Sequence, residues 1–376
     1  MGYYEELGVR RLINADATLT RLGGTRMPRP VLEAMLDAAE SFVDMHDLQL
    51  KVGRRIAELT NNEAAFVCTG ASAGIFLATL ACMTRGDMRA IARLPSLEGL
   101  RNEVVVHRAH RNPYDPAILL AGAKLVEVGN TSQTFDWELD AAIGEKTAAV
   151  FFIAGSHLAR GTLPLERTIE IAHARGVPVV VDGAAQLPPR ENLWRFTRDQ
   201  GADLAIFSGG KGMRGPQASG MVVGKPELIE AIRVNGAPHQ RLGRPMKVGK
   251  EEMLGLLAAV QWYLGLDQEA LLERYERVAR LFVERFGGLP GVTAERSFPS
   301  EAGQPFPRAL IRFDAKRAGI GGAQVQQRLL AGDPPIEVAF AAPDGIYVNP
   351  ETLDPGEEQI VADRLAAILS PVAAAR

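Results

Sequence analysis

The sequence predicts an α/β fold in which helices cover both faces of a mostly parallel sheet. Short apolar runs of strand length alternate with amphipathic segments of helical spacing between residues 64 and 224. Several runs, such as PVVVD at 178–182, carry no polar residue before their last position. Unbroken β-branched residues are typical of strands buried on both faces, as in a parallel sheet. Together these patterns indicate the α/β class.

The predicted elements of the first two thirds of the chain follow in order. Residues 1–30 read as an extended arm, and 28–43 read as a helix with proline near its start. A strand, a small-residue turn and an apolar helix occupy residues 64–83. Six further strands are expected at 104–107, 124–129, 148–154, 178–182, 204–208 and 218–224.

The last third of the chain predicts a second, smaller domain. Residues 250–287 are largely helical, with a break near Gly265, and lead into a small C-terminal α+β domain. That domain would hold strands at 308–314 and 345–350 and a helix at 323–332. The chain is therefore expected to have an arm (1–30), a large domain (31–249), and a bridging helix with a small C-terminal domain (250–376).

The segment FSGGKGMRGPQASG (207–220) places one lysine, Lys211, in a loop of small residues after a strand. Many pyridoxal-phosphate (PLP) enzymes present their Schiff-base amine in this way, because small neighbours let the backbone approach the cofactor. A turn with a solvated lysine would have the same composition, so the interpretation of this loop as a cofactor site needs support from elsewhere in the chain.

That support comes from Asp182, the acid that ends the buried run GVPVVVD. Ligands of open α/β sheets bind at the carboxyl ends of the strands. In a PLP enzyme such an aspartate pairs with the pyridinium nitrogen and keeps it protonated. Alternatively, Asp182 could be a helix cap or a turn residue. The combination of one strand that ends in aspartate and a later strand that leads to lysine favours a cofactor site.

A third segment, residues 64–83, predicts a site for the cofactor's phosphate. The turn between its strand and helix would offer free N–H groups and hydroxyls to a dianion at the helix N-terminus. The residues of this predicted phosphate cup are Thr69, Gly70, Ala71 and Ser72. Alternatively, these small residues serve only to let the helix pack tightly against the strand. Phosphate cup, then acid, then lysine is the chain order of fold type I PLP enzymes, so PLP is the expected cofactor.

Two further residues are candidates for holding the cofactor. Ser208, three residues before the lysine, could donate to the phosphate, although a plain turn serine would look the same. His110 is the candidate for the aromatic group on the ring, with His107 as the second choice. A loop histidine satisfied by its own neighbours is the alternative for both.

The composition excludes several other classes. A net charge of −3 and a pI near 6.1 leave no overall electrostatic attraction for nucleic acid. Two cysteines in apolar surroundings fit a reducing cytoplasm. No signal peptide or run of membrane length is apparent, and the six histidines show no metal-binding spacing. A cytoplasmic protein without metal or membrane partners is therefore expected.

The motifs VDGAAQLPP, FSGGKGMRGPQASG and GRPMKVGKEEMLGLLAAV (243–260) resemble the selenocysteine synthase-like group of PLP enzymes. Its ammonia-lyase-like branch, related to D-glucosaminate-6-phosphate ammonia-lyase, is similar almost from end to end, whereas its seryl-tRNA branch is similar over residues 30–260. The resemblance implies a fold type I enzyme with a mostly parallel seven-stranded sheet and a dimer, or an assembly of dimers, whose sites are completed across the interface. Gly210 departs from the acid that selenocysteine synthases tend to carry before the lysine.

The resemblance also implies a substrate site in the basic segment HQRLGRPMKVGK (239–250). Arg244 and Lys247 resemble the basic pair that selenocysteine synthases direct at a small anion, and Arg241 and His239 belong to the same cluster. A solvated basic face is the alternative. Five N-terminal residues could also reach the site, some from a partner subunit, although each has a structural explanation: Asn14, Thr18, Arg26, His46 and Gln49.

The expected activity is that of a lyase that removes the α-proton of a polar amino acid and eliminates a β-substituent. Lys211 would be the base and Asp182 the partner of the ring nitrogen, and the products would be a 2-keto acid and ammonia. The amino acid could be derived from a sugar or phosphorylated. Three alternatives stay open: an amino-acid racemase or epimerase, selenium or sulfur transfer to seryl-tRNA, and a non-catalytic scaffold.

Overall fold

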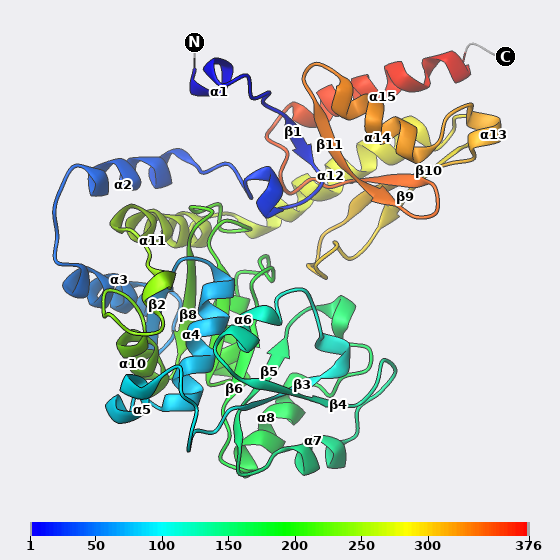
Figure 1. Ribbon diagram of the computed structural model, residues 1–376. Coiled ribbons are helices and arrows are strands. Elements are labelled where there is room, and N and C mark those ends of the chain that lie inside the picture. Colours follow the sequence, from blue (N-terminus) through cyan, green and yellow to red (C-terminus); the bar gives the residue numbers. More distant parts are fainter. Residues whose placement is uncertain (1, 374–376) are drawn as a thin grey trace. The chain divides into compact units, whose positions relative to one another are not determined.

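The computed structural model describes residues 2–373, which divide into two compact units (Figure 1). Unit 1 comprises Met1–Gly24, Asp267–Glu301 and Pro305–Arg376, and unit 2 comprises Thr25–Leu266 with Ala302–Gln304. These boundaries differ from the predicted ones at both ends of the large domain. The first 24 residues of the arm belong with the C-terminal residues, and the helix that begins at Lys250 belongs with the large unit.

Unit 2 is built on a seven-stranded sheet in the order β2-β8-β7-β6-β5-β3-β4. All neighbours are parallel except β8, which is antiparallel to both β2 and β7. The strands are β2 (Ala64–Cys68), β3 (Glu103–His107), β4 (Lys124–Val128), β5 (Thr147–Ile153), β6 (Val179–Asp182), β7 (Leu204–Ser208) and β8 (Gly220–Gly224). Each predicted strand of this region is confirmed to within two residues, as is the mostly parallel sheet.

The helices of unit 2 cover both faces of this sheet. They are α2 (Arg29–Ala39), α3 (Met45–Leu59), α4 (Ala71–Thr84), α5 (Met88–Arg93), α6 (Pro116–Leu120), α7 (Asp136–Ala142), α8 (Leu165–Ala174), α9 (Asn192–Trp194), α10 (Pro226–Asn235) and α11 (Lys250–Leu264). Val180 belongs to the core shared with α4 and α10, whereas Val179 and Val181 belong to the core shared with α3, α8 and α11. Successive strand residues therefore enter opposite cores, which explains the unbroken apolar runs.

Unit 1 holds a five-stranded sheet in the order β1-β11-β12-β10-β9. Its elements are α1 (Tyr3–Glu6), β1 (Ile13–Ala15), α12 (Gln268–Phe286), β9 (Val292–Ser297), β10 (Arg308–Phe313), α13 (Ala315–Ala318), α14 (Gly322–Ala331), β11 (Ile336–Ala341), β12 (Gly345–Val348) and α15 (Glu357–Ala373). Strand β1 pairs in parallel with β11. The N-terminal arm is therefore an edge strand of the small unit.

A salt-bridge network fixes that strand. The Arg21 guanidinium lies 2.7 Å from a carboxylate oxygen of Asp16 and 2.8 Å from one of Glu337, and both carboxylates are buried. Burial raises the pKa of Asp16, while Arg21 opposes that shift. Arg21 therefore compensates two buried acids that lie more than 300 residues apart in the chain, which sequence periodicity could not reveal.

Strand β2 lies at one end of the large sheet, and α3 covers its unpaired edge. The Gln49 side-chain amide donates to the Val67 carbonyl at 2.7 Å. One turn further along α3, a Cβ at Gly53 would lie only 2.3 Å from the Ala65 oxygen. Glycine at position 53 therefore allows the helix to approach the strand closely enough to protect its edge.

Replacing Gly53 with alanine should destabilise unit 2. The added methyl group meets a backbone oxygen, and overpacking of this kind costs about 1–3 kcal/mol, which exceeds the roughly 1 kcal/mol that alanine gains in helix propensity. The midpoint of urea unfolding should fall. Gly144→Ala is the matched control, because nothing lies within 4 Å of its added Cβ. Equal midpoints for the two variants would contradict this account of the α3–β2 contact.

Candidate active site

Parallel pairing of β6 with β7 brings the predicted acid and lysine to the same edge of the sheet. Asp182 is the last residue of β6 and lies opposite Ile206 of β7. Strand β7 ends two residues later at Ser208, and Lys211 follows in the loop. On the other side of Asp182, Ile153 ends β5. The site is thus assembled at the carboxyl ends of three adjacent strands, where ligands of such sheets bind.

The Asp182 carboxyl group is buried, with only 7% of the residue exposed. Burial raises its pKa, and two contacts oppose this shift: the Ala184 N–H, which donates to Oδ1 at 3.0 Å, and the positive charge of Lys211. A buried carboxylate with a single hydrogen bond and a nearby cation is suited to a further positively charged or proton-donating partner. The protonated nitrogen of a pyridine ring is such a partner.

Close backbone packing holds the Lys211 loop in place. A Cβ at Gly209 would lie 2.0 Å from the Ser219 hydroxyl oxygen, and one at Gly212 would lie 2.5 Å from the Leu187 carbonyl oxygen. The Lys211 carbonyl accepts from the Arg214 N–H at 2.8 Å. The small residues around the half-buried lysine are therefore a packing requirement, because any side chain there would push the loop out of position.

The predicted phosphate cup lies at the N-terminus of α4. Gly70 precedes the helix with φ +116°, a conformation that favours glycine. Thr69 donates to the Ala218 carbonyl at 3.4 Å, while Ala71 is half-buried and Ser72 is exposed. A 14-residue helix leaves the N–H groups of its first turn without intrahelical partners, as an anion site requires.

Gly220 joins the cup to the lysine strand. It lies at the start of β8, where it pairs with Cys68 on one side and with Ser208 on the other. A Cβ at this position would lie 2.7 Å from the Gly70 carbonyl carbon and 2.8 Å from the Ala71 nitrogen. Glycine at 220 therefore lets the cup approach the β7–β8 end, and the residues present here fit a phosphate-bearing cofactor.

His110 lies near Asp182, but its ring is enclosed by protein. Its Nδ1 accepts from the Ile153 N–H at 3.2 Å, and its ring centroid is 4.6 Å from that of Phe152. Only 1% of the residue is exposed, and burial lowers the pKa of His110 to about 3 and that of His107 to about 4. The described contacts support the alternative of a satisfied histidine, so contact with the cofactor ring stays a prediction.

Arg244 and Lys247 line a cavity of about 280 Å³ with Met45, Pro238 and Met253. Both cations are exposed, and neither forms an ion pair within residues 2–373. Arg241 is half-buried nearby in the chain. No described contact joins these three residues to Lys211 or Asp182, so their role toward a substrate also stays a prediction.

The five N-terminal candidates have structural contacts. Asn14 closes a turn in unit 1 by donating to the Ala17 carbonyl, and Thr18 is half-buried in the same segment. In unit 2, the Arg26 carbonyl accepts from Arg214. His46 packs on His239 at 4.8 Å between ring centroids, and Gln49 binds the edge of β2. None of these contacts reaches Lys211 or Asp182.

Thr25 is a site residue that the sequence did not reveal. Its hydroxyl group lies 3.3 Å from the Gly210 carbonyl oxygen and 3.4 Å from that of Lys211. It therefore supports the lysine loop from more than 180 residues away, and no local pattern marks it.

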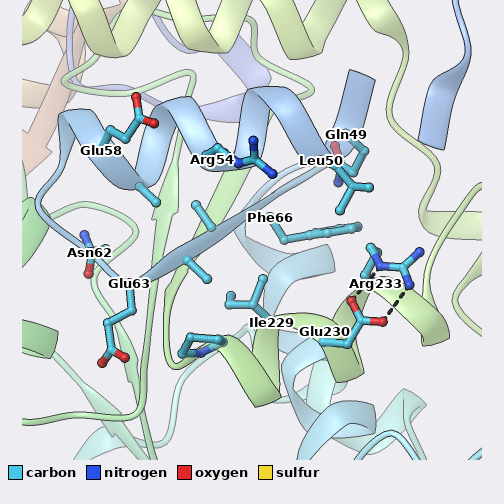
Figure 2. A pocket seen from close by; sticks show the side chains of 14 residues that line it. Gln49, Leu50, Arg54, Glu58, Asn62, Glu63, Phe66, Ile229, Glu230 and Arg233 are labelled. Carbon is cyan, nitrogen blue, oxygen red and sulfur yellow. Dashed lines mark hydrogen bonds and ion pairs between the residues drawn. The ribbon is translucent and has the colours of Figure 1, made fainter. Parts of the chain in front are cut away.

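A larger cavity, of about 330 Å³, lies between α3, β2 and α10 (Figure 2). Leu50, Phe66 and Ile229 form its apolar wall, and the Glu230–Arg233 ion pair lies at its edge. None of the predicted cofactor ligands lines it.

Among the described residues no group of three acidic, histidine or cysteine side chains could hold a metal, and no helix is long and apolar enough to cross a membrane.

The fold, the buried acid, the lysine loop and the phosphate cup define a PLP-dependent enzyme of fold type I. The model of the family described as "SelA: L-seryl-tRNA selenium transferase" matches residues 20–283. D-glucosaminate-6-phosphate ammonia lyase of Salmonella typhimurium is 32% identical over 372 residues, which cover 97% of each chain. The protein belongs to the SelA family, as the sequence motifs predicted.

Other relatives agree with this assignment. A 5'-C-glycyluridine monooxygenase-decarboxylase of a Streptomyces species is 36% identical over 97% of this chain and 92% of its own. The L-seryl-tRNA(Sec) selenium transferase of Solidesulfovibrio magneticus is 26% identical over 96% of this chain and 83% of its own. A solved structure of D-glucosaminate-6-phosphate ammonia-lyase superposes with a TM-score of 0.86, at 31% identity, over 99% of both chains.

Asp182 makes a testable contribution to pH-dependent stability in the cofactor-free protein. Because burial raises its pKa, the folded protein keeps this proton at pH values where the unfolded chain has lost it. The folded state is thus favoured at low pH and loses that advantage as the pH rises through the raised pKa. Asp182→Asn should remove this pH-dependent loss of stability. The urea midpoint of the variant, relative to that of the wild type, should therefore increase as the pH rises.

Asp140→Asn provides a control of opposite sign. Arg175 lowers the pKa of this exposed carboxyl, so its charge stabilises the folded protein above the pKa of the unfolded chain. The control variant should therefore lose stability relative to the wild type as the pH rises. If the urea midpoints of the wild type and of Asp182→Asn changed with pH in the same way, Asp182 would not be desolvated in the folded protein.

Proposed function

We propose that this protein is a PLP-dependent lyase acting on a polar, sugar-derived α-amino acid. It removes the α-proton and eliminates a β-hydroxyl group, which leaves an enamine that hydrolyses to a 2-keto acid and ammonia. The observation that carries the proposal is the end-to-end similarity, in sequence and in structure, to D-glucosaminate-6-phosphate ammonia-lyase. The buried Asp182 beside Lys211 supplies the groups that this chemistry needs.

Five groups of this chain would hold the cofactor. Lys211 would bind its aldehyde carbon, and Asp182 would keep the proton on its ring nitrogen. The cup residues Thr69–Ser72 and the Ser208 hydroxyl would bind its phosphate, and His110 would lie against its ring. When bound, PLP withdraws electrons from the α-carbon and so makes the α-proton acidic enough to be removed.

Lys211 then acts as the general base. Its Nζ lies in a half-buried loop that Thr25 and the neighbouring glycines hold in place. Because the loop already holds the lysine in position, little conformational entropy is lost when its amine takes the α-proton, and the activation barrier is lower. Asp182 would support the same step by keeping the proton on the ring nitrogen of the cofactor.

The basic cluster would select the substrate. Arg241, Arg244 and Lys247 would bind a carboxylate or phosphate group, and Arg244 offers a planar fork for two hydrogen bonds. The names of two relatives support a sugar-derived substrate, since D-glucosaminate-6-phosphate and 5'-C-glycyluridine both combine an α-amino acid with a sugar.

A second candidate is oxidative decarboxylation of such an amino acid. It is favoured by one observation, the 36% identity to a monooxygenase-decarboxylase over nearly the whole chain. Both reactions begin with loss of a group from the same α-carbon. Products separate them, because elimination releases ammonia and a keto acid without oxygen, whereas oxidative decarboxylation takes up O2 and releases CO2.

We further propose a homodimer, or an assembly of dimers, that acts in the cytoplasm and has no nucleic acid partner. Two buried cysteine thiols support a reducing compartment, and the net charge of −3 supports the absence of a nucleic acid substrate.

The test of the function is a screen of D- and L-amino acids and 2-amino sugar acids with the PLP-loaded protein. We expect release of ammonia and keto acid in equal amounts, with the same yield in the absence of oxygen. Lys211→Ala should abolish the release, because it lacks the base. O2 uptake with CO2 release would instead establish the second candidate. Exchange of the α-hydrogen with D2O while the amine is retained would indicate a racemase.

Arg244→Ala tests the substrate site. Loss of charge-assisted hydrogen bonds worth about 1.5–3 kcal/mol should lower kcat/KM by about 10-fold to 100-fold. Arg244→Lys should restore little of the lost kcat/KM, since the point charge of a lysine cannot reproduce the planar guanidinium fork. Inorganic phosphate should compete with substrate in the wild type and lose that effect in Arg244→Ala. Arg54→Ala is the matched control, because Arg54 is also exposed and without an ion pair among the described residues but lines the other cavity. Equal kinetics of the two alanine variants would contradict the assignment.

A further inference from the structure

Residues 302–304 are grouped apart from their neighbours in the chain. Glu301 and Pro305, which flank them, belong to unit 1, whereas Ala302, Gly303 and Gln304 belong to unit 2. The first two are half-buried, and only 3% of Gln304 is exposed. These three residues, the 302–304 segment, form neither helix nor strand, so contacts with side chains of unit 2 must hold them in place.

Two buried glutamines join the 302–304 segment to the turn that follows Asp182. The side-chain amide of Gln186 donates to the Ala302 carbonyl at 2.8 Å, and that of Gln304 donates to the Leu187 carbonyl at 2.9 Å. Only 7% of Gln186 is exposed. Because little water can replace a lost partner at buried positions, these two hydrogen bonds are costly to break. They fix the segment to the turn.

A third contact joins the 302–304 segment to the end of β5. The Ser156 hydroxyl group, three residues beyond that strand, donates to the Gly303 carbonyl at 2.9 Å. Gly303 has φ +79°, and a Cβ there would lie 2.8 Å from both Ser156 Oγ and His157 Nδ1. Glycine is therefore needed for the close approach. The segment thus bridges the residues that follow two adjacent strands, β5 and β6.

The Leu187 carbonyl oxygen that accepts from Gln304 also supports the lysine loop. A Cβ at Gly212, the residue after Lys211, would lie only 2.5 Å from this oxygen. The loop therefore packs directly on the group that Gln304 holds. One short segment is in this way connected both to the turn after the acid and to the surface on which the lysine loop rests.

We propose that Gln186 and Gln304 are positioning residues, which use the 302–304 segment to hold Asp182 and Lys211 at the separation that the cofactor requires. The acid would bind the ring nitrogen of the cofactor and the lysine its aldehyde carbon. Because the ring between these atoms is rigid, a displacement of either group weakens one of the two bonds. The proposal rests on the proposed roles of Asp182 and Lys211, and not on the reaction with substrate.

The visible absorption band of the PLP-loaded protein, measured without substrate, provides the test. Gln304→Met keeps the volume of the side chain but removes the donor, so the turn after Asp182 should move relative to the lysine loop. Asp182 then holds the proton on the ring nitrogen less firmly. A less positive ring lets the Lys211 nitrogen, once bound to the cofactor, keep its own proton to a higher pH. The pH midpoint of the band should therefore rise by about 0.5–1 unit.

The dissociation constant for PLP provides a second measurement, which should rise by about 3-fold to 10-fold in Gln304→Met. Gln326→Met is the matched control. The Gln326 amide also donates to a backbone carbonyl, that of Val338 at 2.7 Å, but it does so within unit 1. The control should lower the urea midpoint of the cofactor-free protein and leave the band and the affinity for PLP unchanged. A purely structural glutamine at 304 would behave in the same way.

Two further variants act on the same segment. Gln186→Met removes the bond to Ala302, and Ser156→Ala removes the bond to Gly303 from an exposed side chain, so the core stays intact. Both should raise the pH midpoint of the band. Gln186→Met combined with Gln304→Met should raise it by less than the sum of the single shifts, because both side chains act through one segment.

Neighbouring histidines do not account for such a shift. Burial lowers the pKa of His110 to about 3, and it also lowers the pKa of His157. Both rings are therefore neutral where the band is followed, at neutral pH and above. The absorbance then reports the cofactor and the two groups that hold it.

The inference is overturned if Gln304→Met matches Gln326→Met in both the pH midpoint and the dissociation constant for PLP. Should Gln304→Met not fold, wild-type values in both Gln186→Met and Ser156→Ala would overturn it equally. Lys211→Ala separates this failure from a failure of the proposed roles. Borohydride should attach the cofactor covalently to the wild type and not to Lys211→Ala. Covalent attachment to Lys211→Ala would refute the role of the lysine, and the inference with it.

Discussion

The parallel pairing of β6 with β7 is the contact on which the candidate active site depends. It sets Asp182 opposite Ile206, and so places the buried acid beside the strand whose loop carries Lys211. A shift of one residue in this pairing would turn the side chains of the shifted strand toward the opposite cores and would displace Asp182 relative to the lysine loop. The register is therefore determined by the two cores on either face of the sheet, and the acid and the lysine depend on it.

Close backbone approach is the second constraint, and glycine provides it at each junction. Gly220 lets the turn before α4 approach the start of β8, and Gly209 and Gly212 let the lysine loop pack on Ser219 and Leu187. Gly53 allows α3 to cover the edge of β2 in the same way. These positions are distributed over the whole of unit 2, so the geometry of the site is a property of the unit rather than of one loop.

Membership of the SelA family and the observed contacts answer different questions. The family and the fold establish the cofactor and the type of enzyme. The contacts explain why Asp182 suits a protonated ring nitrogen, since the carboxyl group is desolvated and only partly compensated. Relatives with a lyase name and with a monooxygenase-decarboxylase name share most of this chain's length, so the reaction must depend on side chains around the common centre.

The sequence alone determined the strands of the large sheet and the order of cup, acid and lysine, because these depend on local periodicity and on short motifs. It also placed the break between α11 and α12 close to Gly265, where the helix ends. It did not reveal β1, β9 or β11 of the small sheet. Tertiary structure decided the rest: the pairing of β1 with β11, the support of the lysine loop by Thr25, the enclosure of His110, and the cavity that joins Met45 to Met253. Each of these brings together residues that are distant in the chain, and their contacts depend on burial and close packing in three dimensions, which no local pattern contains.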